Sequence, residues 1–405
     1  MNFREEFKFY RTKTKTPLRY SFVLPVHIKA ELIKAETNDM MKSSLQDSFF
    51  RALFEGHIGP YLFITVSRDN IYKESMDVVR CLNIEDVRKQ LRITFKCEEG
   101  VDSGGIRKEY FQLLSHEIKH DERLFYNNES TIWLRNDCLD MSAYMTIGKI
   151  LGIALYNNVL LNIPFPSVFF KKLLGKKTTF YDLKEIDPEL FCSLTNLKKL
   201  SEEDIAGLGL TFTINYTSSK NKTKTYNLTE DKSEKSVTKS NINSFVNRYA
   251  DFYINRSIYR QFEAIKKGFL FVIERETLFY LDHKELEKII MGSNDFDVHA
   301  LRSTASYTDY ESDSQIISWF WAIFESYGKK MRKKLLQFIT GNDRIPVAGA
   351  ASVKLIIMKN GCDTDRLPSS QTCFNTLLLP EYSSKKKLES KLRTALEMTA
   401  GFYLL

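Results

Sequence analysis

A single cysteine, Cys373, stands at the junction of a polar loop and an apolar run in the segment LPSSQTCFNTLLLP, residues 367–380. A thiol is a strong nucleophile even though little of it is thiolate at neutral pH, so its position matters as much as its pKa. At the end of a loop the sulfur is open to an incoming group. We therefore expect Cys373 to carry an acyl group in transit.

The alternative is that Cys373 is one more small buried hydrophobe, as free cysteines in proteins often are. The run CFNTLLL predicts a strand, on which alternate residues share one face: Cys373, Asn375, Leu377 and Leu379. Two other cysteines, Cys81 and Cys192, lie within apolar-periodic segments and are expected to point inward. Composition alone does not separate the two interpretations of Cys373.

Two kinds of thiol chemistry differ in what else they need. A cysteine protease needs a histidine that takes the thiol proton and then protonates an amine leaving group. No histidine follows His299, and the six histidines form no motif with Cys373, which disfavours hydrolysis; a histidine brought in by the fold stays an alternative. Exchange with an acyl thioester needs no strong general acid, because its leaving group is itself a good thiolate. Cys373 fits this exchange better.

Composition excludes several other classes. The cysteines show no CxxC pair and no Cys/His cluster, so we expect no disulfide, no metal site and no cofactor. The net charge of +8 comes without a nucleic-acid motif, so no nucleic-acid partner is expected. The stretch IGKILGIALYNNVLLNIPF carries Lys149 and two asparagines, which indicates a buried helix and no membrane insertion. With no signal peptide in MNFREEFKFYRTKTKT, an intracellular location in the cytoplasm or nucleus is expected.

At 405 residues the chain exceeds the length at which single cores stop growing, so we expect two lobes. After an N-terminal extension, residues 1–19, a large and mainly helical lobe should span residues 20–290, since DSFFRALFEGH and EYFQLLSHEIKH show helical spacing. TFTINY and KTYNLT flank a polar tip and predict a β-hairpin within this lobe. A glycine and short polar residues in MGSND predict a flexible hinge at residues 291–295.

The C-terminal part, residues 296–405, predicts a smaller α/β lobe. SDSQIISWFWAIFESYG predicts an amphipathic helix that Ser312 can cap and Gly328 can stop. VKLIIMK predicts a strand that leads into a turn, and KKKLESKLRTALEMTAG predicts a closing helix with Gly401 as its stop. The residues from Phe402 onward are expected outside any regular element. The predicted fold class is therefore α+β, with two lobes.

Several segments, in this order along the chain, resemble motifs of the HECT-type ubiquitin ligases. They are FKCEEGVDSGGIRKEYFQLL, IGKILGIALYNNVLLNIPFP, GKKTTFYDL, FVNRYADFYINRSIYRQFEAIKKGF, TGNDRIPVAG, LPSSQTCFNTLLLPEYSSKKKL and the final GFYLL. The resemblance covers the chain from about Tyr20 to Leu405. It implies a bilobal HECT domain whose N-terminal lobe binds a ubiquitin-conjugating enzyme, with a subdomain at about residues 180–270. A flexible hinge joins this lobe to a smaller one that carries the cysteine.

The resemblance places Cys373 on the catalytic cysteine of the family. By similarity, Cys373 would take ubiquitin from the conjugating enzyme as a thioester and pass it to a lysine of a protein substrate. Thr372, Phe374 and Asn375 flank the cysteine as in the family and would orient the thioester. Phe402, fourth from the end, falls where the family has a phenylalanine needed for transfer to lysine. Arg344 in TGNDRIPVAG matches a family loop position, although a surface ion pair is its alternative role.

The surface for the conjugating enzyme is also implied by the resemblance. It would be formed in part by apolar residues of the segments PELFCSLTNLKKL, LGL and SFVNRYADF, namely Leu190, Leu194, Leu197, Leu200, Leu210 and Phe245. Taken alone, this leucine spacing is more typical of a helix that packs into a core. The functional interpretation depends on the family resemblance.

Gln371 departs from the family pattern, in which many members have histidine just before the TC pair. An amide does not titrate near neutrality, so Gln371 cannot replace an imidazole that acts as a base. The effect is expected on lysine transfer more than on thioester formation. The alternative function is a catalytically impaired scaffold that binds a conjugating enzyme. The short segment before Tyr20 cannot fold as a separate substrate recruiter, so we expect either part of a longer ligase or a reduced ligase.

Overall fold

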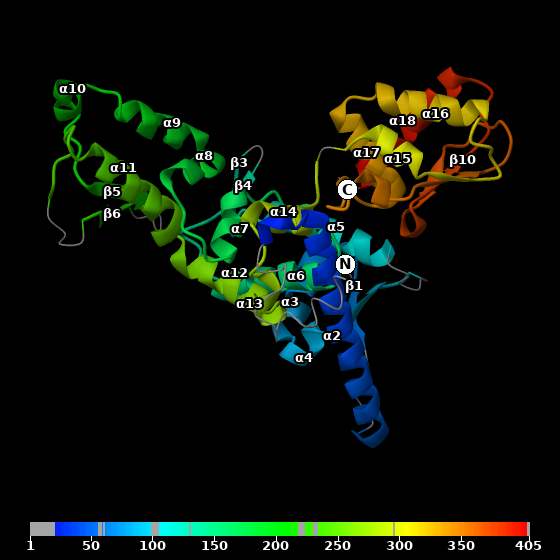
Figure 1. Cartoon of the computed structure of the whole chain (residues 1–405), viewed down its shortest axis with the longest axis horizontal. Coiled ribbons are helices and arrows are strands. Elements are labelled where there is room, and N and C mark those ends of the chain that lie inside the picture. Colours follow the sequence, from blue (N-terminus) through cyan, green and yellow to red (C-terminus); the bar gives the residue numbers. More distant parts are fainter. Residues whose placement is uncertain are drawn as a thin grey trace.

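The computed structural model describes residues 21–55, 59, 61–98, 105–128, 131–217, 223–229, 234–294 and 296–402. Within these ranges, the side chains of Ser21, residues 47–55, Cys373 and residues 399–402 lie outside the description. The predicted extension at residues 1–19 and Asp295 of the predicted hinge also lie outside the described residues. Buried side chains gather in two clusters, one from Leu24 to Met291 and the other from Val298 to Leu396. We call the parts of the chain that carry them the larger and the smaller lobe (Figure 1).

The larger lobe is mainly helical in its described residues. Its α-helices are α2 (Val26–Glu55), α3 (Ile71–Cys81), α4 (Ile84–Val87), α5 (Gly105–Lys119), α6 (Met141–Tyr156), α7 (Ser167–Leu173), α8 (Leu183–Ile186), α9 (Pro188–Leu197), α10 (Glu202–Gly207), α11 (Ile242–Asp251), α12 (Tyr259–Val272), α13 (Arg275–Leu278) and α14 (His283–Met291). Short sheets accompany them. Strands β1 (Tyr61–Val66) and β2 (Gln90–Phe95) pair in parallel, whereas β3 (Phe125–Asn128) with β4 (Thr131–Leu134) and β5 (Thr213–Thr217) with β6 (Thr223–Asn227) pair antiparallel.

The smaller lobe combines a mixed sheet with four α-helices among its described residues. The sheet has the order β7-β8-β10-β9, with β7 (Ser306–Thr308), β8 (Ile356–Lys359), β9 (Ser369–Gln371) and β10 (Thr376–Leu379). Strand β10 runs parallel to β8 and antiparallel to β9. The helices are α15 (Val298–Ser303), α16 (Gln315–Ser326), α17 (Lys329–Thr340) and α18 (Lys385–Phe402).

Helices α6 and α12 form the centre of the larger lobe because glycines let their backbones approach closely. A Cβ on Gly148 of α6 would lie 2.0 Å from the carbonyl oxygen of Ile265, and a Cβ on Gly268 of α12 would lie 1.9 Å from that of Met145. Real Cβ atoms do not make such contacts. The pattern in IGKILGIALY that predicted a buried helix therefore also sets the distance between two helices.

Lys149 of α6 is 4% exposed and caps the end of α3. Its Nζ donates to the carbonyl oxygens of Val79 (3.3 Å), Arg80 (3.1 Å) and Leu82 (2.8 Å). A cation that satisfies the last carbonyls of a helix is favourable there. The lysine that argued against a membrane span thus has a structural role. None of the helices in the described part of the chain has both the length and the apolar character needed to cross a membrane.

The elements from α8 to α11, with β5 and β6, extend away from the rest of the larger lobe, opposite the smaller lobe (Figure 1). They join α12 through a π-helical turn, Phe252–Arg256. Lys172 of α7 holds this turn, since its Nζ donates to the carbonyl oxygen of Ile254 (2.7 Å) and to Oδ1 of Asn255 (2.6 Å). A π turn is an uncommon break in a helix and often marks a functional place. We call the part from α8 to α11 the outer subdomain.

The expected α+β class is confirmed, and so is the hairpin, which is the β5–β6 pair. Some predicted ends were wrong. Helix α16 begins after Ser314 rather than Ser312, because the Oγ of Ser314 accepts from the backbone N–H of Glu311 and turns the chain there. It ends at Ser326, and Gly328 instead precedes α17, a helix that the sequence analysis missed. Helix α18 runs through Gly401 to Phe402, so Gly401 does not stop it.

Candidate active site

The segment around Cys373 is a tight reversal of the backbone between β9 and β10. Residues Thr372–Phe374 form a 3-10 turn, and Asn375 follows in the left-handed region with φ of 53°. The predicted strand CFNTLLL is therefore only partly correct, because β10 begins at Thr376. The left-handed residue breaks the alternation of faces, so Asn375 does not share a strand face with Leu377. We call residues 371–375 the cysteine loop.

Three backbone and side-chain bonds of Asn375 fix the shape of the cysteine loop. Its N–H donates to the carbonyl oxygen of Thr372 (3.4 Å), and its own carbonyl oxygen accepts from the N–H of Ile356 in β8 (3.0 Å). Its side-chain Nδ2 donates to the carbonyl oxygen of Val353 (2.7 Å). Asparagine suits this position because it tolerates the left-handed region better than most residues. The backbone of Cys373 is thus held at the tip of a defined turn.

The other predicted residues of the loop differ in exposure. Phe374 is 59% exposed, and Gln371 at the end of β9 is also exposed, whereas Thr372 is half-buried. The side-chain amide of Gln371 makes no hydrogen bond with another residue that the structure describes. Thr372 packs at the end of α17, where a Cβ on Gly341 would lie 3.3 Å from its Cβ. The side chains of Cys373 and Phe402 lie outside the described residues, so their predicted roles stay predictions.

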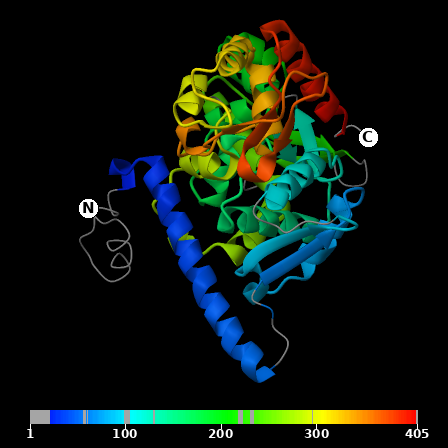
Figure 2. The same cartoon turned by 90° about the vertical axis from the view of Figure 1, so that its right-hand side faces the viewer.

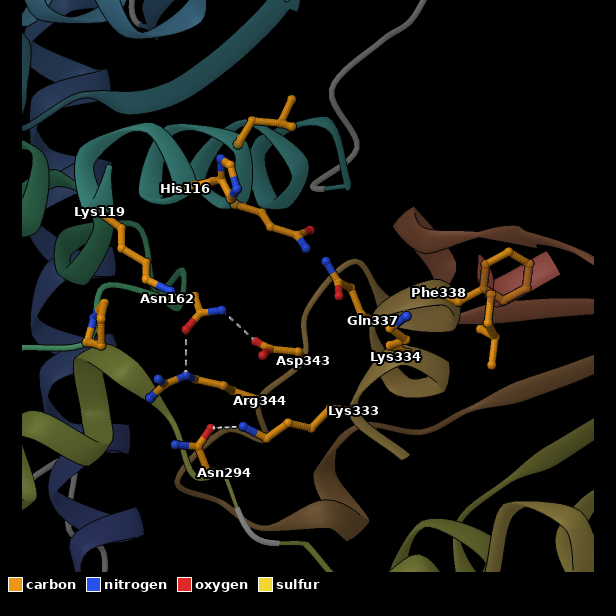
Figure 3. Close-up of a pocket in the computed structure, with 14 residues that line it drawn as sticks. His116, Lys119, Asn162, Asn294, Lys333, Lys334, Gln337, Phe338, Asp343 and Arg344 are labelled. Carbon is orange, nitrogen blue, oxygen red and sulfur yellow. Dashed lines mark hydrogen bonds between the residues drawn. The ribbon is translucent and has the colours of Figure 1, made fainter. Parts of the chain in front are cut away.

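Arg344 does not reach into the cysteine loop and instead joins the two lobes near the chain connection. Its Nε donates to Oδ1 of Asn162 (3.0 Å), and one terminal nitrogen donates to the carbonyl oxygen of Met291 (3.3 Å). Nδ2 of Asn162 in turn donates to Oδ1 of Asp343 (3.0 Å), as Figure 3 shows. Burial lowers the pKa of Arg344, and the nearby Asp343 opposes that shift. In place of the surface ion pair considered from the sequence, Arg344 makes a half-buried contact between the lobes.

The backbone continues this contact. Ser293 and Ile345 exchange two hydrogen bonds, of 2.7 Å and 3.0 Å, as an isolated antiparallel bridge. Helix α14 ends just before it, at Met291, and Gly292 has a positive φ of 68°. Lys333 of α17 donates to Oδ1 of Asn294. The segment predicted as a hinge is therefore bonded to the smaller lobe in this arrangement.

A cavity of about 480 Å³ lies between the lobes beside these contacts. Helix α5 supplies one wall and α17 the other (Figure 3). Its lining is mostly basic and amide-bearing: Gln112, His116, Lys119, Asn162, Asn294, Lys333, Lys334, Gln337, Asp343 and Arg344, with Leu113, Pro164, Phe338 and Leu396 as apolar members. The wall at α17 also supports the cysteine loop, because α17 contacts both β9 and the 3-10 turn.

Helix α5 of the larger lobe touches the cysteine loop directly. The Nζ of Lys108, in the second half of the first turn of α5, donates to Oδ1 of Asn375 over 3.2 Å. The smaller lobe sits over α5 with the loop facing it (Figure 2). Sequence reasoning missed Lys108 and Asn162. Both lie within segments quoted for their family resemblance, but their local patterns carry no signal of a contact with the other lobe.

The predicted apolar surface lies in the outer subdomain. Leu190, Leu197, Leu200 and Leu210 are half-buried and pack against the core, whereas Leu194 and Phe245 are 5% and 4% exposed. These two side chains belong to the core of the subdomain, as the alternative interpretation of the leucine spacing stated. Exposed apolar neighbours, Tyr181 and Leu208, flank the half-buried leucines in sequence. The set is brought into one subdomain, far from the cysteine loop in this arrangement (Figure 1).

The expectation that Cys81 and Cys192 point inward was wrong. Both are exposed, as are Cys97 and Cys362, while Cys138 is partly exposed. Cys81 is the last residue of α3, off the buried face formed by Ile71, Met76 and Val79. Exposure therefore does not single out one cysteine. What distinguishes Cys373 is the tight turn that holds its backbone.

Comparisons with known proteins identify the family of the chain. A family model described as HECT-domain (ubiquitin-transferase) matches residues 107–405. The probable E3 ubiquitin-protein ligase mug30 of Schizosaccharomyces pombe is 33% identical over 95% of this chain and 52% of its own length. The human probable E3 ubiquitin-protein ligase HECTD2 is 34% identical over 95% of the chain and 52% of its length. Human HERC4, also described as a probable E3 ubiquitin-protein ligase, is 32% identical over 95% of the chain and 38% of its own length.

The chain thus spans about half of the length of these curated relatives, or less. The family match covers most of the chain, including α5 from residue 107 onward, the connection between the lobes and the cysteine loop. The chain therefore belongs to the HECT-domain family of ubiquitin transferases.

Proposed function

We propose that this chain is the catalytic part of a ubiquitin-protein ligase that accepts ubiquitin on Cys373 and transfers it to a lysine of a protein substrate. The observation that carries the proposal is the position of Cys373, whose backbone lies at the tip of the turn between β9 and β10 within the segment that matches the family. The turn residues on either side fix the backbone at this position.

The proposed reaction has two exchanges at one carbonyl carbon. In the first, the Cys373 thiolate attacks the C-terminal carbonyl of ubiquitin carried by a conjugating enzyme, a new carbon–sulfur bond forms and the old one breaks. The cysteine of the conjugating enzyme leaves as a thiolate and takes up a proton. In the second, a lysine amine attacks the new thioester, an amide forms, and the released Cys373 thiolate or solvent takes the amine proton. Both leaving groups are good thiolates, so no strong general acid is needed.

The supporting residues of the loop would act through the shape of the turn. Thr372 packs on Gly341, and Asn375 holds the exit of the turn through Val353 and Ile356. Phe374 follows Cys373 in sequence, is exposed, and would offer an apolar contact to the incoming ubiquitin. Gln371 precedes the turn and can donate or accept a hydrogen bond. Arg344 supports the site from the connection between lobes, and Phe402 stays a proposed transfer residue by family resemblance.

We assign the lobes to different partners. Residues 20–290 would bind the conjugating enzyme, 291–295 would be the hinge, and 296–405 would carry ubiquitin. The binding surface would be the part of the outer subdomain formed by α9, α10 and the segment that follows each of them. The half-buried leucines there are Leu190, Leu197, Leu200 and Leu210. Leu194 and Phe245 are buried in the core and would support the binding surface from below. Leu208 and Tyr181 are exposed and would add apolar area to this surface.

Further partners follow from the chemistry rather than from the fold. Protein substrates with an accessible lysine are proposed, without nucleic acid or membrane insertion, and with cytoplasm or nucleus as the location. For the segment NGCDTDRLPSSQTCFNTLLLPEYSSKKKL we propose a relation to the C-terminal segment of the Angelman-syndrome ligase, the host partner of a papillomavirus oncoprotein. The relatives named above match over 95% of the chain.

One observation favours a second candidate. Gln371 stands where many family members have histidine. Its side-chain amide is exposed and has no hydrogen-bond partner among the described residues. A scaffold that binds a conjugating enzyme but transfers ubiquitin slowly would fit this difference. Discharge of the thioester to free lysine at a rate typical of the family would exclude the scaffold.

The test uses activating enzyme, a charged conjugating enzyme and ubiquitin, with parallel gels run with and without reducing agent. Wild type should form an adduct that disappears on reduction, and Cys373→Ala should form none. Cys362→Ala is the matched control, because Cys362 is an exposed cysteine of the same lobe. Its adduct should equal that of wild type. Cys373→Ser should give an oxyester that resists thiols and is cleaved by alkali.

An undiminished adduct in Cys373→Ala would overturn the proposal, as would loss of the adduct in Cys362→Ala alone. Absence of an adduct with every member of a panel of conjugating enzymes would favour the scaffold. Binding of a conjugating enzyme to Leu208→Asp would then show whether the outer subdomain carries the docking surface.

A further inference from the structure

Lys108 connects the larger lobe to the cysteine loop. It is half-buried on α5, and its Nζ donates to Oδ1 of Asn375, a residue 267 positions further along the chain. Asn375 lies two residues after Cys373 in sequence. The bond is therefore a contact between lobes at the place where the acyl group would be held.

Asn375 is well placed to transmit this contact to the turn. Its Nδ2 is committed to the carbonyl oxygen of Val353, and its backbone is bonded to Thr372 and Ile356. With Nδ2 engaged inside the smaller lobe, the Oδ1 atom of the same amide points outward to Lys108. A donor at Oδ1 thus acts on an amide whose position is already fixed, and a charged donor makes this bond stronger than a neutral one would.

Lys108 also projects from a rigid frame. Its neighbours Tyr110 and Phe111 are buried in the core of the larger lobe. The next residue, Glu109, accepts from Arg68 over 2.6 Å, and Arg68 also donates to Glu98, three residues after the end of β2. The guanidinium of Arg68 lies 4.1 Å from the centre of the Phe95 ring. The first turns of α5 are therefore anchored to β2, and Lys108 cannot follow the smaller lobe if that lobe moves.

The arrangement with this bond places the cysteine loop over α5, on the opposite side of the larger lobe from the outer subdomain (Figures 1 and 2). The cysteine loop docked on α5 lies far from the proposed docking surface on α9 and α10 (Figure 1). With ubiquitin delivered at that surface, the Lys108–Asn375 bond would belong to the state after ubiquitin has been received.

We propose that Lys108 is a positioning residue for the second exchange: it holds the cysteine loop against α5 while ubiquitin passes from Cys373 to lysine. The inference depends on the proposed function, because it assigns a role within the transfer step. Lys108 has no role in the loading of ubiquitin on Cys373, and the rates of loading and discharge can be measured separately.

The test is a pair of single-turnover assays on the full chain. Loading is followed as the adduct formed from charged conjugating enzyme, and discharge is followed after further loading is blocked and free lysine is added. Lys108→Ala should load within twofold of wild type and discharge about tenfold more slowly, the effect of losing one charge-assisted hydrogen bond. Lys108→Arg should restore most of the rate. The control Lys73→Ala removes the same charge from an exposed position on α3 and should change neither step.

A double-mutant cycle ties the effect to the named bond. Asn375→Gly keeps the left-handed backbone and removes the acceptor, so Lys108→Ala should cost no further rate in that background. A full additional loss would overturn the inference, because Lys108 would then act elsewhere. Equal losses in loading and discharge with a lower thermal midpoint would also overturn it, since they indicate a purely structural role.

A measurement without ubiquitin separates this inference from the proposed function. Amide hydrogen exchange in residues 372–376 should be several-fold faster in Lys108→Ala than in wild type and unchanged in Lys73→Ala. Unchanged exchange in both variants would overturn the docking contact. Absence of any adduct on wild type would instead overturn the proposed function, and the role in transfer with it.

Discussion

Asn162 of the larger lobe binds two consecutive residues of the smaller lobe with one amide. Its Oδ1 accepts from Nε of Arg344 and its Nδ2 donates to Oδ1 of Asp343, each over 3.0 Å. Both halves of the amide are therefore used, and both bonds join the lobes. The same Arg344 also reaches the carbonyl oxygen of Met291, the last residue of α14. The connection between the lobes is held by side chains as well as by the Ser293–Ile345 bridge.

Replacing Asn162 with alanine should loosen this connection. Arg344 and Asp343 would each lose a partner in a half-buried place, which costs about 1–3 kcal/mol for each group left unsatisfied. Amide exchange at Ser293 and Ile345 should rise several-fold, and Arg344→Ala should have a similar effect. In the variant that carries both Asn162→Ala and Arg344→Ala, the rise in exchange rate should be only slightly greater than the larger of the two single rises. Asn196→Ala, at an exposed position on α9, is the control, and additive effects would contradict the coupling.

The crossing of α6 and α12 leads to a prediction on stability. Gly148→Ala and Gly268→Ala each insert a Cβ about 2 Å from a backbone carbonyl oxygen, where the neighbour is not a flexible side chain. The helices must separate, so each variant should destabilise the larger lobe by about 3 kcal/mol or more. Unfolding of the larger lobe in denaturant, followed by its intrinsic fluorescence, measures this loss of stability. Gly207→Ala, with nothing within 4 Å of the added Cβ, should be neutral or slightly stabilising.

The sequence predicted best what depends on local pattern. Apolar spacing identified α5, α6 and α18, and the polar tip between TFTINY and KTYNLT identified the hairpin, because periodicity reports which face of one element is buried. It gave no access to contacts between distant segments. Lys108 and Asn375 are 267 residues apart, and Asn162 and Arg344 are 182 apart. Their pairing depends on how the two lobes dock, which no local spacing encodes.

The errors near the site have local causes as well. Alternation in CFNTLLL is the same for a strand and for a turn followed by a strand, and only the left-handed backbone of Asn375 separates the two. Helix α17 was missed because KKMRKKLLQFIT begins with a run of cations that suggests a solvated segment, although its buried residues Leu335, Leu336 and Ile339 recur at helical spacing. Helix α17 contacts the cysteine loop, so part of the support of the site was not predicted from the sequence.

Lys172 predicts a pH dependence of stability. Burial lowers the pKa of Lys172 to about 8, against the opposing effect of Asp251 and Glu263. The unfolded chain keeps the ordinary lysine pKa near 10.4, so between about pH 8 and 10 the unfolded state binds more protons than the folded one. Stability therefore rises with pH in this window, by about 2 kcal/mol between pH 7.5 and 9.5 from this group. The neutral amine can still donate to Ile254 and Asn255.

The measurement compares the free energy of unfolding of wild type and Lys172→Met across this pH range. The variant keeps the length of the side chain but not the titrating group, so the difference between the two proteins should grow with pH. Lys176→Met is the control, since Lys176 is exposed at its ion pair with Asp282. A difference that stays constant from pH 7.5 to 9.5 would show that Lys172 titrates at its ordinary value.

The last prediction concerns Gln371, which ends β9 opposite Thr376 and is exposed beside the turn that holds Cys373. A histidine at this exposed position should keep a pKa near 6.5, because solvent surrounds it. If the position serves proton removal from the attacking lysine, Gln371→His should discharge thioester faster than wild type. The gain should be about tenfold, less than the 10²–10⁴ of a well-placed general base, because the side chain is not held by neighbours.

The pH profile distinguishes a base from a hydrogen-bond partner. The lysine nucleophile titrates equally in both proteins, so the ratio of the discharge rates of Gln371→His and wild type isolates the imidazole. This ratio should rise through about pH 6.5 and then level off, since the neutral ring is the active form. Gln371→Ala should show a flat ratio near one, and loading should be the same in all three proteins. A flat ratio for Gln371→His would mean that the amide already does what the position requires, which removes the main reason to favour an impaired scaffold.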